Sequence, residues 1–569
     1  MTAQRAGSYT SGTSDVPLLG VTIGDMFDAV VARYPDNEAL ISRHQGIRYA
    51  YRDLKREVDR CARALIALGV TKGQRIGIWA PNCAEWAIVQ FATSKLGAIL
   101  VNINPSYRLT EVQYAVRQSG CTWLVIAPSF KTSDYTAMIH ELAPELAASR
   151  PGELAAAQLP DLRAVIRLGA EPSPGMLMWG DLLAMADRVS DDDLAQRQRQ
   201  QEFDDPINIQ YTSGTTGYPK GATLSHHNIL NNGFFVTELL RFTDRDRLLI
   251  PVPLYHCFGM VMGNLGCMSH GATMIYPSDG FDATAVLEAA QAERATALYG
   301  VPTMFIAELN HPEFAGYDLT SLRTGIMAGS PCPVEVMKQV KTLMHMDEVV
   351  VAYGMTETSP VSTQTRIGAP LDKQVGTVGQ VHPHVQIKIV DPQTNQVVPV
   401  GERGELCTRG YSVMLGYWNN EEATHGAIDA ARWMHTGDLA TMDDEGYLNI
   451  VGRIKDMIIR GGENVYPREI EEFLYSHPAV QDVQVIGVPD EKFGEEIMAW
   501  IKLREGQTAT VEEIRDHCRG KIAHYKIPRY VKFVDAFPLT VTGKVQKFVM
   551  REVSVTELGL EHAAAMKMA

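Results

Sequence analysis

Short apolar runs alternate with helical periods along the first part of the chain. Apolar stretches that stop at Pro, Asn or Gly are followed by segments with apolar residues at helical spacing. Repeated units of this kind predict parallel β-α-β structure with helices on both faces of a sheet. The predicted elements are two amphipathic helices within residues 23–68 around a hairpin at 39–51, strands at 75–80, 99–103 and 122–127, and helices at 84–96 and 109–118.

A second alternating series predicts a further set of strands with a helix at 283–294; the strands are at 248–252, 272–276, 297–299, 325–328 and 349–353. From about residue 375 to 450 the strands are short and separated by Gly and Asp turns, which predicts a mostly antiparallel subdomain. The last part, from Gly452, has its own small β/α pattern, with a helix that begins at Pro467. Residues 143–160 and 189–206 are predicted to be surface connections.

Composition and charge narrow the class of protein. The 569 residues are 45% hydrophobic and 21% charged, which excludes a disordered chain. Lys plus Arg is 52 and Asp plus Glu is 67, so the formal charge is 52 − 67 = −15, and nucleic acid is not an expected partner. Charged and polar residues interrupt every apolar stretch before about 18 residues, so no transmembrane segment is predicted.

Cysteine usage and the termini bear on location. The eight cysteines are scattered, with no C-x-x-C pair, which favours reduced and mostly buried thiols over a disulfide framework or a zinc site. The polar start of the chain lacks the apolar segment of a secretory signal. A cytoplasmic protein is therefore expected.

The segment YTSGTTGYPKG at residues 211–221 is the most informative motif. Its glycines let backbone N–H groups approach phosphate oxygens closely, and its lysine supplies a cation. It is not a Walker A box, because Pro219 precedes the lysine and Gly221 follows it. By itself the segment is equally compatible with an ordinary surface loop. The candidate phosphate-binding residues are Thr212, Ser213, Gly214, Thr215, Thr216, Gly217 and Lys220.

Four longer motifs follow in order: YGMTE at 353–357, WMHTGD at 433–438, GRIKDMIIRGGENVYP at 452–467 and PLTVTGK at 538–544. With these motifs the chain resembles, from about residue 20 to 550, the adenylate-forming superfamily of acyl-CoA synthetases, firefly luciferase and peptide-synthetase adenylation domains. Within it, the chain looks most like a medium- or long-chain fatty acyl-CoA synthetase. The resemblance implies ATP, Mg²⁺, coenzyme A and a fatty acid as cofactors and substrates. A homodimer is compatible with it.

The resemblance also implies an organisation. The expected fold class is α/β, with a large N-terminal body of α/β subdomains, a β-rich subdomain, and a small mobile C-terminal α+β domain. The expected boundaries are a flexible leader at 1–18, an AMP-binding and acyl-binding body at 19–452, and a mobile domain at 453–569 that carries the catalytic lysine, with a hinge at Lys455.

Residue roles are carried over onto matching positions. Glu357 is expected to hold Mg²⁺ on the nucleotide phosphates, Asp438 to accept from the ribose hydroxyls, and Lys544 to reach the carboxylate and the α-phosphate. Tyr353 is expected to lie against the purine, with room left by Gly354. The catalytic set is Lys544, Thr356, Glu357 and His256. The nucleotide and coenzyme A set adds Gly329, Ser330, Pro331, Tyr353, Gly354, Met355, Asp438, Arg453, Lys455, Gly461, Gly462 and Glu463.

The acyl pocket is open to two interpretations. His256 matches the family position that flanks the substrate carboxylate. Apolar residues around it either form the walls of an alkyl pocket or simply pack the core. They are Met260, Gly263, Met327, Ala328, Met355 and Val361.

The expected reaction is ATP-dependent formation of acyl-AMP followed by transfer to coenzyme A. The closest alternative is a fatty acyl-AMP ligase that delivers to a carrier protein; more distant ones are a luciferase-like oxygenase and a non-catalytic nucleotide-binding scaffold. The GGENVYP segment at 461–467 resembles the loop of CoA ligases, and no clear insertion stands near it. An acceptor that is free coenzyme A is therefore preferred.

Overall fold

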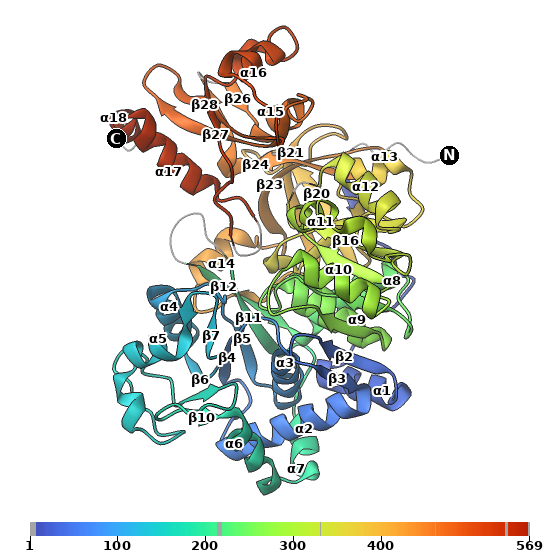
Figure 1. Ribbon diagram of the computed structural model, residues 1–569, viewed down its shortest axis with the longest axis vertical. Coiled ribbons are helices and arrows are strands. Elements are labelled where there is room, and N and C mark those ends of the chain that lie inside the picture. The colour runs from blue at the N-terminus through green and yellow to red at the C-terminus, as the bar shows by residue number, and fades with distance from the viewer. Residues whose placement is uncertain (1–6, 213–218, 331, 461–462, 541–543, 567–569) are drawn as a thin grey trace. The chain divides into compact units, whose positions relative to one another are not determined.

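The computed structural model describes residues 7–212, 219–330, 332–460, 463–540 and 544–566, and the chain divides into two compact units (Figure 1). The large unit comprises residues 10–387 and 408–435, and the small unit comprises residues 1–9, 388–407 and 436–569. The sequence places residues 388–407 and 436–452 in the body, so the two divisions differ there. The boundaries predicted from the sequence remain predictions.

The first sheet of the large unit has eight strands. Its strands from β10 to β11 are parallel neighbours, and β12 and β22 add to one end in antiparallel orientation. The order across the sheet is β10 (Leu177–Met178), β9 (Ala164–Arg167), β6 (Cys121–Ile126), β4 (Arg75–Trp79), β5 (Ile99–Asn102), β11 (Pro206–Thr212), β12 (Lys220–Ser225) and β22 (Gly416–Tyr417).

The second sheet of the large unit has nine strands, with a parallel centre from β17 to β2 and antiparallel strands at both ends. The order is β19 (Gln380–Val381), β18 (Val361–Gln364), β17 (Glu348–Gly354), β16 (Thr324–Ala328), β15 (Ala297–Gly300), β13 (Arg247–Leu249), β14 (Thr273–Tyr276), β2 (Glu38–Ser42) and β3 (Ile47–Ala50).

Helices pack on both sheets of the large unit. They are α1 (Ile23–Arg33), α2 (Tyr51–Leu68), α3 (Ala84–Leu96), α4 (Leu109–Ser119), α5 (Tyr135–Leu142), α6 (Trp179–Ala184), α7 (Asp191–Gln198), α8 (His226–Leu239), α9 (Gly266–His270), α10 (Ala283–Ala292), α11 (Pro302–Leu309), α12 (Val334–Leu343), α13 (Leu371–Gly376) and α14 (Glu421–Ala427). A π-helix, η3 (Phe258–Leu265), leads into α9.

Helix α3 lies between the two sheets, because it contacts β5 of the first and β2 of the second. Every residue of α3 except Glu85 is buried, as expected for a helix that is apolar on all sides. The buried ammonium of Lys95 near its end is paired with Asp28 at 2.8 Å and with Asp59 at 2.5 Å. A charge at this depth is stable only with such partners.

The small unit is built on a sheet of order β26 (Glu463–Val465), β25 (Ile458–Arg460), β28 (Gly494–Leu503) and β27 (Val480–Asp490), with β29 (Tyr530–Phe533) parallel to β28. Its helices are α15 (Pro467–Leu474), α16 (Val511–Cys518), α17 (Lys547–Leu558) and α18 (Glu561–Met566). A further sheet has the order β1 (Tyr9–Ser11), β20 (Val385–Val390), β21 (Gly404–Gly410), β23 (Met434–Met442) and β24 (Leu448–Arg453), and the division of the chain runs through its strands.

These elements confirm the α/β class, and most predicted strands and helices are present. Two segments differ from expectation. Residues 191–198, predicted to be part of a connection, form α7, because Ser190 caps the helix and exchanges hydrogen bonds with Asp193. Residues 9–11, within the expected leader, form strand β1. The cysteines are all free and, except for the half-buried Cys332, buried, as predicted. No helix in the described part of the chain is long and apolar enough to span a bilayer.

Candidate active site

Strands β11 and β12 frame the predicted phosphate loop. Thr212 at the end of β11 lies opposite Lys220 at the start of β12, and its hydroxyl donates to the carbonyl oxygen of Lys220 over 3.4 Å. Strand pairing therefore holds these two predicted residues next to each other. The other predicted residues of the segment lie outside the described part of the chain; they are Ser213, Gly214, Thr215, Thr216 and Gly217.

Two further predicted nucleotide segments lie at the carboxyl ends of neighbouring strands. Gly329 and Ser330 follow β16 directly, and Tyr353 and Gly354 are the last residues of β17. Because β16 and β17 are parallel, their carboxyl ends share one edge of the sheet, where open α/β sheets bind ligands. The structure thus brings these two segments together. Pro331 is outside the described residues.

Gly354 has a reason of its own for lacking a side chain. A Cβ atom at this position would lie 1.7 Å from the carbonyl oxygen of Pro360. The same oxygen accepts the backbone N–H of Met355 over 3.0 Å. From the sequence, Gly354 is expected to leave room for a purine. The close approach of the chain to itself at Pro360 is already sufficient to require a glycine here.

Glu357 lies in a short 3₁₀ turn, η5 (Thr356–Thr358), and is 5% exposed. The backbone N–H of Met414 donates to its carbonyl oxygen over 2.9 Å, and the hydroxyl of Tyr417 donates to its Oε1 over 2.8 Å. The ring of Tyr417 also lies under the ammonium of Lys220, with 5.1 Å from Nζ to the ring centroid. One tyrosine that the sequence reasoning missed therefore contacts both the predicted metal ligand and the predicted phosphate lysine.

His256 lies just before the π-helix η3 and is separated from it by one residue, Cys257. Its Nδ1 accepts the backbone N–H of Phe258 over 3.2 Å. A ring nitrogen that accepts carries no proton, so the neutral imidazole has its proton on Nε2. That proton is a donor of the kind that suits a carboxylate or a phosphate oxygen. The expected place of His256 beside the substrate carboxylate remains a prediction.

Buried amides fix the start of η3. The side-chain amide of Gln210 donates to Asn208 Oδ1 over 2.8 Å and to the sulfur of Met260 over 3.0 Å. The thiol of Cys257 donates to Gln210 Oε1 over 3.1 Å, and Asn208 donates to Asn102 Oδ1 over 2.9 Å. A π-helix is uncommon and needs such compensation. The network anchors the chain directly after His256.

Several residues that the sequence assigns either to the walls of an alkyl pocket or to the core are tightly packed in the structure. Met260 is 1% exposed and its sulfur accepts from amides, and Met327 is fully buried within a second hydrophobic cluster. A Cβ atom at Gly263 would lie 2.9 Å from Ile250, so this glycine is tightly packed as well. These three residues belong to the core of the large unit.

Asp438 and Arg453 of the small unit form an ion pair. They are opposite each other on the antiparallel strands β23 and β24, and the Arg453 Nε donates to Asp438 Oδ1 over 2.8 Å. The Asp438 side chain is 7% exposed and that of Arg453 is 59% exposed. Asp438, the predicted ribose contact, and Arg453, a predicted nucleotide-binding residue fifteen positions later in the sequence, are thus brought together.

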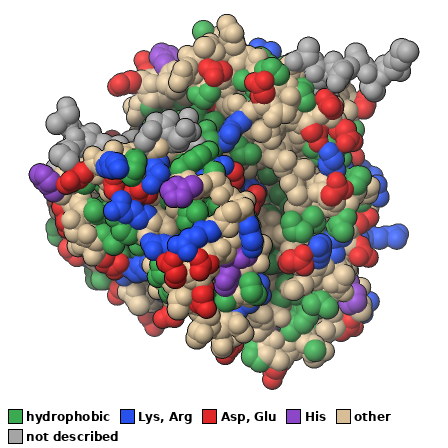
Figure 2. Space-filling view, turned by 90° about the horizontal axis from the view of Figure 1, so that it is seen from above, with side chains coloured by type: hydrophobic (Ala, Val, Ile, Leu, Met, Phe, Trp, Pro, Cys, Tyr) green, Lys and Arg blue, Asp and Glu red, His purple; other side chains and the backbone are tan. Residues whose placement is uncertain are grey.

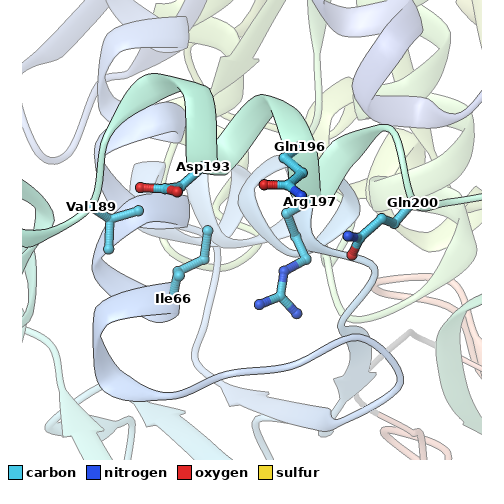
Figure 3. A pocket seen from close by; sticks show the side chains of 6 residues that line it. All are labelled: Ile66, Val189, Asp193, Gln196, Arg197 and Gln200. Atoms are coloured by element: carbon cyan, nitrogen blue, oxygen red, sulfur yellow. The ribbon is translucent and has the colours of Figure 1, made fainter.

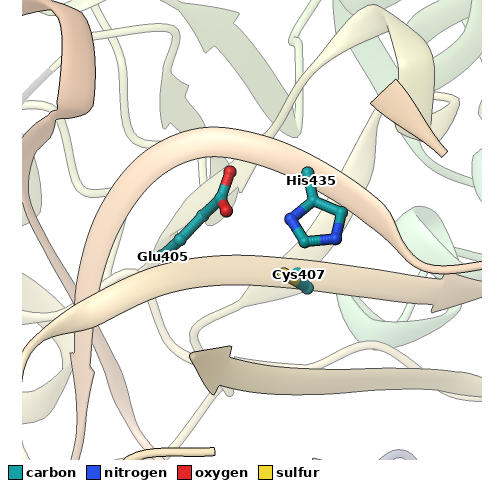
Figure 4. A group of neighbouring side chains, drawn as sticks. All are labelled: Glu405, Cys407 and His435. Atoms are coloured by element: carbon teal, nitrogen blue, oxygen red, sulfur yellow. The ribbon is translucent and has the colours of Figure 1, made fainter. Parts of the chain in front are cut away.

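The turn before Asp438 is fixed by strand β21. The Thr436 hydroxyl donates to the carbonyl of Leu406 over 2.7 Å, and the N–H of Gly437 donates to Glu405 Oε1 over 3.0 Å. Glu405 and Cys407 project from the same strand, as Figure 4 shows. Gly437 has φ +71°, a conformation that glycine adopts without strain. These contacts fix the backbone next to Asp438, whose side chain forms the ion pair with Arg453.

Two hydrogen bonds hold the backbone of Lys544 next to Thr540. Its backbone N–H donates to the Thr540 hydroxyl over 3.0 Å, and its carbonyl accepts the N–H of Thr540 over 2.7 Å. Lys455 lies in a short 3₁₀ turn directly after β24, and Glu463 begins β26. Gly461 and Gly462 lie outside the described residues. Lys544, Lys455, Asp438, Arg453 and Glu463 all belong to the small unit, and the other described candidates belong to the large unit.

A hollow of about 350 Å³ in the large unit is separate from these residues (Figure 3). Residues of α7, residues that flank it on both sides, and one residue near the end of α2 line the hollow, and no predicted site residue is among them; they are Ile66, Val189, Asp193, Gln196, Arg197 and Gln200. On the face shown in Figure 2, acidic and basic side chains both occur, so the net charge of −15 does not make that face uniformly acidic.

Comparison with known proteins bears on the whole chain. The model of the AMP-binding enzyme family matches residues 27–418, and that of the AMP-binding enzyme C-terminal domain matches residues 469–544. The putative acyl-CoA synthetase YngI of Bacillus subtilis is 49% identical over 543 residues, which are 95% of this chain and 99% of that protein. The mitochondrial medium-chain acyl-CoA ligase ACSF2 of Danio rerio is 48% identical over 558 residues, 97% of this chain and 91% of that protein.

Among solved structures, the anthranilate CoA ligase AuaEII in complex with anthranoyl-AMP superposes with a TM-score of 0.84 at 28% identity. The match covers 96% of this chain and 99% of that one. Similarity of fold therefore extends over nearly the full length of both proteins.

Proposed function

The chain belongs to the family of AMP-binding enzymes, and we propose that it activates a medium-chain fatty acid with ATP and transfers the acyl group to coenzyme A. AMP-forming fatty acid–CoA ligation is its activity, and ATP and coenzyme A are its co-substrates. The observation that carries this conclusion is the near full-length identity of 44–49% to proteins named acyl-CoA synthetase or medium-chain acyl-CoA ligase. A medium-chain acid is proposed because the ACSF2 relatives are named medium-chain acyl-CoA ligases.

Two displacement steps make up the reaction. A carboxylate oxygen of the fatty acid attacks the α-phosphorus of ATP, the bond to the β-phosphate oxygen breaks, and pyrophosphate leaves. The coenzyme A thiol then loses its proton to water, the resulting thiolate attacks the carbonyl carbon of acyl-AMP, and AMP leaves with the electrons of the acyl C–O bond. No covalent intermediate with the protein is required, so positioning and charge neutralisation provide the catalysis.

In the large unit, Lys220 supplies a cation for the phosphates, and Glu357 would hold Mg²⁺. The buried Glu357 carboxylate accepts from Tyr417 at one oxygen, and its second oxygen would bind the metal. Such a carboxylate fits a hard cation that takes its other ligands from phosphate and water. Such a cation would neutralise charge on the transferring phosphates. The segments after β16 and β17 would receive the adenine, with Tyr353 as the stacking ring.

In the small unit, Asp438 accepts from the ribose hydroxyls while Arg453 keeps its carboxylate oriented. Lys544 stabilises the charge that develops in the first step, since a compact ammonium suits a carboxylate and an α-phosphate oxygen. A hinge at Lys455 would let Lys544 withdraw for the second step. His256 would donate from Nε2 to the fatty carboxylate.

The competing interpretations differ in the acyl acceptor. Delivery to a carrier protein is not favoured, because the relatives above are named for CoA ligation. A cytoplasmic location and a homodimer remain predictions; the ACSF2 relatives are mitochondrial by name.

Pyrophosphate exchange and AMP release test the activity in two stages. Fatty acid-dependent exchange of labelled pyrophosphate into ATP is expected without coenzyme A, and continuous AMP release is expected only when coenzyme A is added. Exchange without any coenzyme A-dependent release would indicate an acyl-AMP ligase. Absence of both would indicate a non-catalytic protein. The matched control is Lys544→Ala, which should lose the exchange reaction.

A further inference from the structure

Tyr417 is held in place by backbone contacts that are independent of its side chain. Strand β22 pairs with β12 so that Tyr417 lies opposite Ala222. The N–H of Trp418 donates to the carbonyl of Gly221 over 2.7 Å, and the N–H of Tyr417 donates to the Thr424 hydroxyl over 2.9 Å. The strand that begins at Lys220 and the strand that ends at Tyr417 therefore form one rigid ladder.

The side chain of Tyr417 connects two groups of the proposed nucleotide site. Its hydroxyl donates to Oε1 of Glu357 over 2.8 Å, and the Lys220 Nζ lies 5.1 Å from its ring centroid. The Tyr417 hydroxyl is the donor in this hydrogen bond, because a carboxylate oxygen accepts.

The Tyr417 donor on Oε1 restricts how the carboxylate can turn. Glu357 is nearly buried, and a charged acceptor in such surroundings depends strongly on each partner. With Oε1 engaged, Oε2 is the oxygen left to face a cation. The cation–π contact meanwhile keeps the Lys220 ammonium beside the same ring.

We propose that Tyr417 is a positioning residue for the proposed reaction: it orients the Glu357 carboxylate toward the metal of the metal–nucleotide complex and holds Lys220 beside it. The proposal rests on the proposed function, and it adds a residue that contacts neither nucleotide nor acyl group in this role. Its effect should be confined to the contribution that the metal makes to nucleotide binding.

Nucleotide binding with and without metal separates this role from a structural one. The probe is α,β-methylene-ATP, an ATP analogue whose α,β bridge cannot be cleaved. Its binding is measured by calorimetric titration in the presence of Mg²⁺ and again in the presence of a chelator. The Kd with the chelator divided by the Kd with Mg²⁺ measures what the metal contributes to binding. Tyr417→Phe keeps the ring and removes only the hydroxyl, and it should reduce this ratio on the order of 10-fold or more, as expected for the loss of a hydrogen bond to a charged group.

Tyr51→Phe is the matched control. Tyr51 is a fully buried tyrosine of the large unit, whereas Tyr417 is half-buried, and the Tyr51 hydroxyl donates to the carbonyl of Ala272 over 2.7 Å, outside the proposed site. Tyr51→Phe should lose at least as much stability as Tyr417→Phe and keep the wild-type ratio. In Glu357→Gln, adding Tyr417→Phe should cause little further change in the ratio, because the carboxylate that it orients is already gone.

Equal Kd ratios in wild type, Tyr417→Phe and Tyr51→Phe would overturn the proposal. So would a full additional loss in the double variant. Failure of the proposed function would look different: wild-type protein would show no fatty acid-dependent AMP release, whatever the ratio in the variants. Tyr417→Leu, which also removes the ring, should further weaken nucleotide binding in the chelator, where only Lys220 is affected.

Discussion

A buried histidine should make the large unit sensitive to mild acid. His226, the first residue of α8, has no exposed surface, and its Nδ1 accepts the N–H of Ile23 at the start of α1 over 3.2 Å. Its Nε2 has no hydrogen-bond partner within the described residues. Burial lowers the pKa of His226 to about 4, although the charges of Asp205 and Asp25 oppose the shift and that of Lys72 adds to it.

The sign and size of the effect follow from linkage. Above the usual histidine pKa of 6.5, both the folded and the unfolded states are neutral and His226 contributes no pH dependence. As the pH falls below that value, the unfolded state binds a proton that the folded state excludes until about pH 4. The free energy of unfolding should therefore fall by about 2 kcal/mol between about pH 7.5 and about pH 5 because of this one residue.

Urea unfolding of three proteins at the two pH values provides the assay. In His226→Gln the amide oxygen can still accept from Ile23 but cannot be protonated. The free energy of unfolding of wild type minus that of this variant should be about 2 kcal/mol lower at the lower pH than at the higher pH. His425→Gln changes an exposed histidine of α14 and should follow wild type. A wild-type-minus-His226→Gln difference that is the same at both pH values would refute the reasoning.

Three other substitutions test the site. Lys544→Ala should slow acyl-AMP formation on the order of 100- to 1000-fold and leave thioester formation from supplied acyl-AMP largely intact; equal loss in both half-reactions, measured by rapid quench, contradicts the division of roles. Arg453→Met should raise the KM for ATP but change the unfolding free energy by less than about 1 kcal/mol, because the arginine is mostly exposed; an unchanged KM removes it from the nucleotide site. Gln210→Leu should cost about 1–3 kcal/mol in urea unfolding, since Asn208 loses its buried donor; a neutral result would show that the network relaxes.

Elements with strong periodicity were predictable from the sequence. Helix α3 and strands β4 and β5 appear within one residue of the expected limits, because their apolar patterns leave no alternative burial. Helix α7 was missed because its composition is polar, and the signal that defines it is local: Ser190 followed three residues later by Asp193. Strand β1 was missed because three residues carry no period, and only pairing within a sheet stabilises them.

Motifs located the candidate residues but not their mutual contacts. The opposition of Asp438 and Arg453 depends on the register of two strands, which includes a bulge between Leu439 and Ala440 that the sequence does not reveal. Tyr417 was missed for a similar reason. Its only local signal is an aromatic residue with a polar tip after Gly416, and its importance arises from pairing with β12, which lies about 190 residues earlier in the chain.

The acyl specificity is the central claim, and coenzyme A-dependent AMP release across straight-chain acids from acetate to palmitate tests it most directly, with benzoate as an aromatic comparison. A maximum of kcat/KM at medium chain length, with little activity toward acetate and benzoate, is the predicted result. A maximum at acetate or at the aromatic acid would contradict the fatty-acid assignment, and one at palmitate would contradict the medium-chain proposal while leaving the CoA ligase intact.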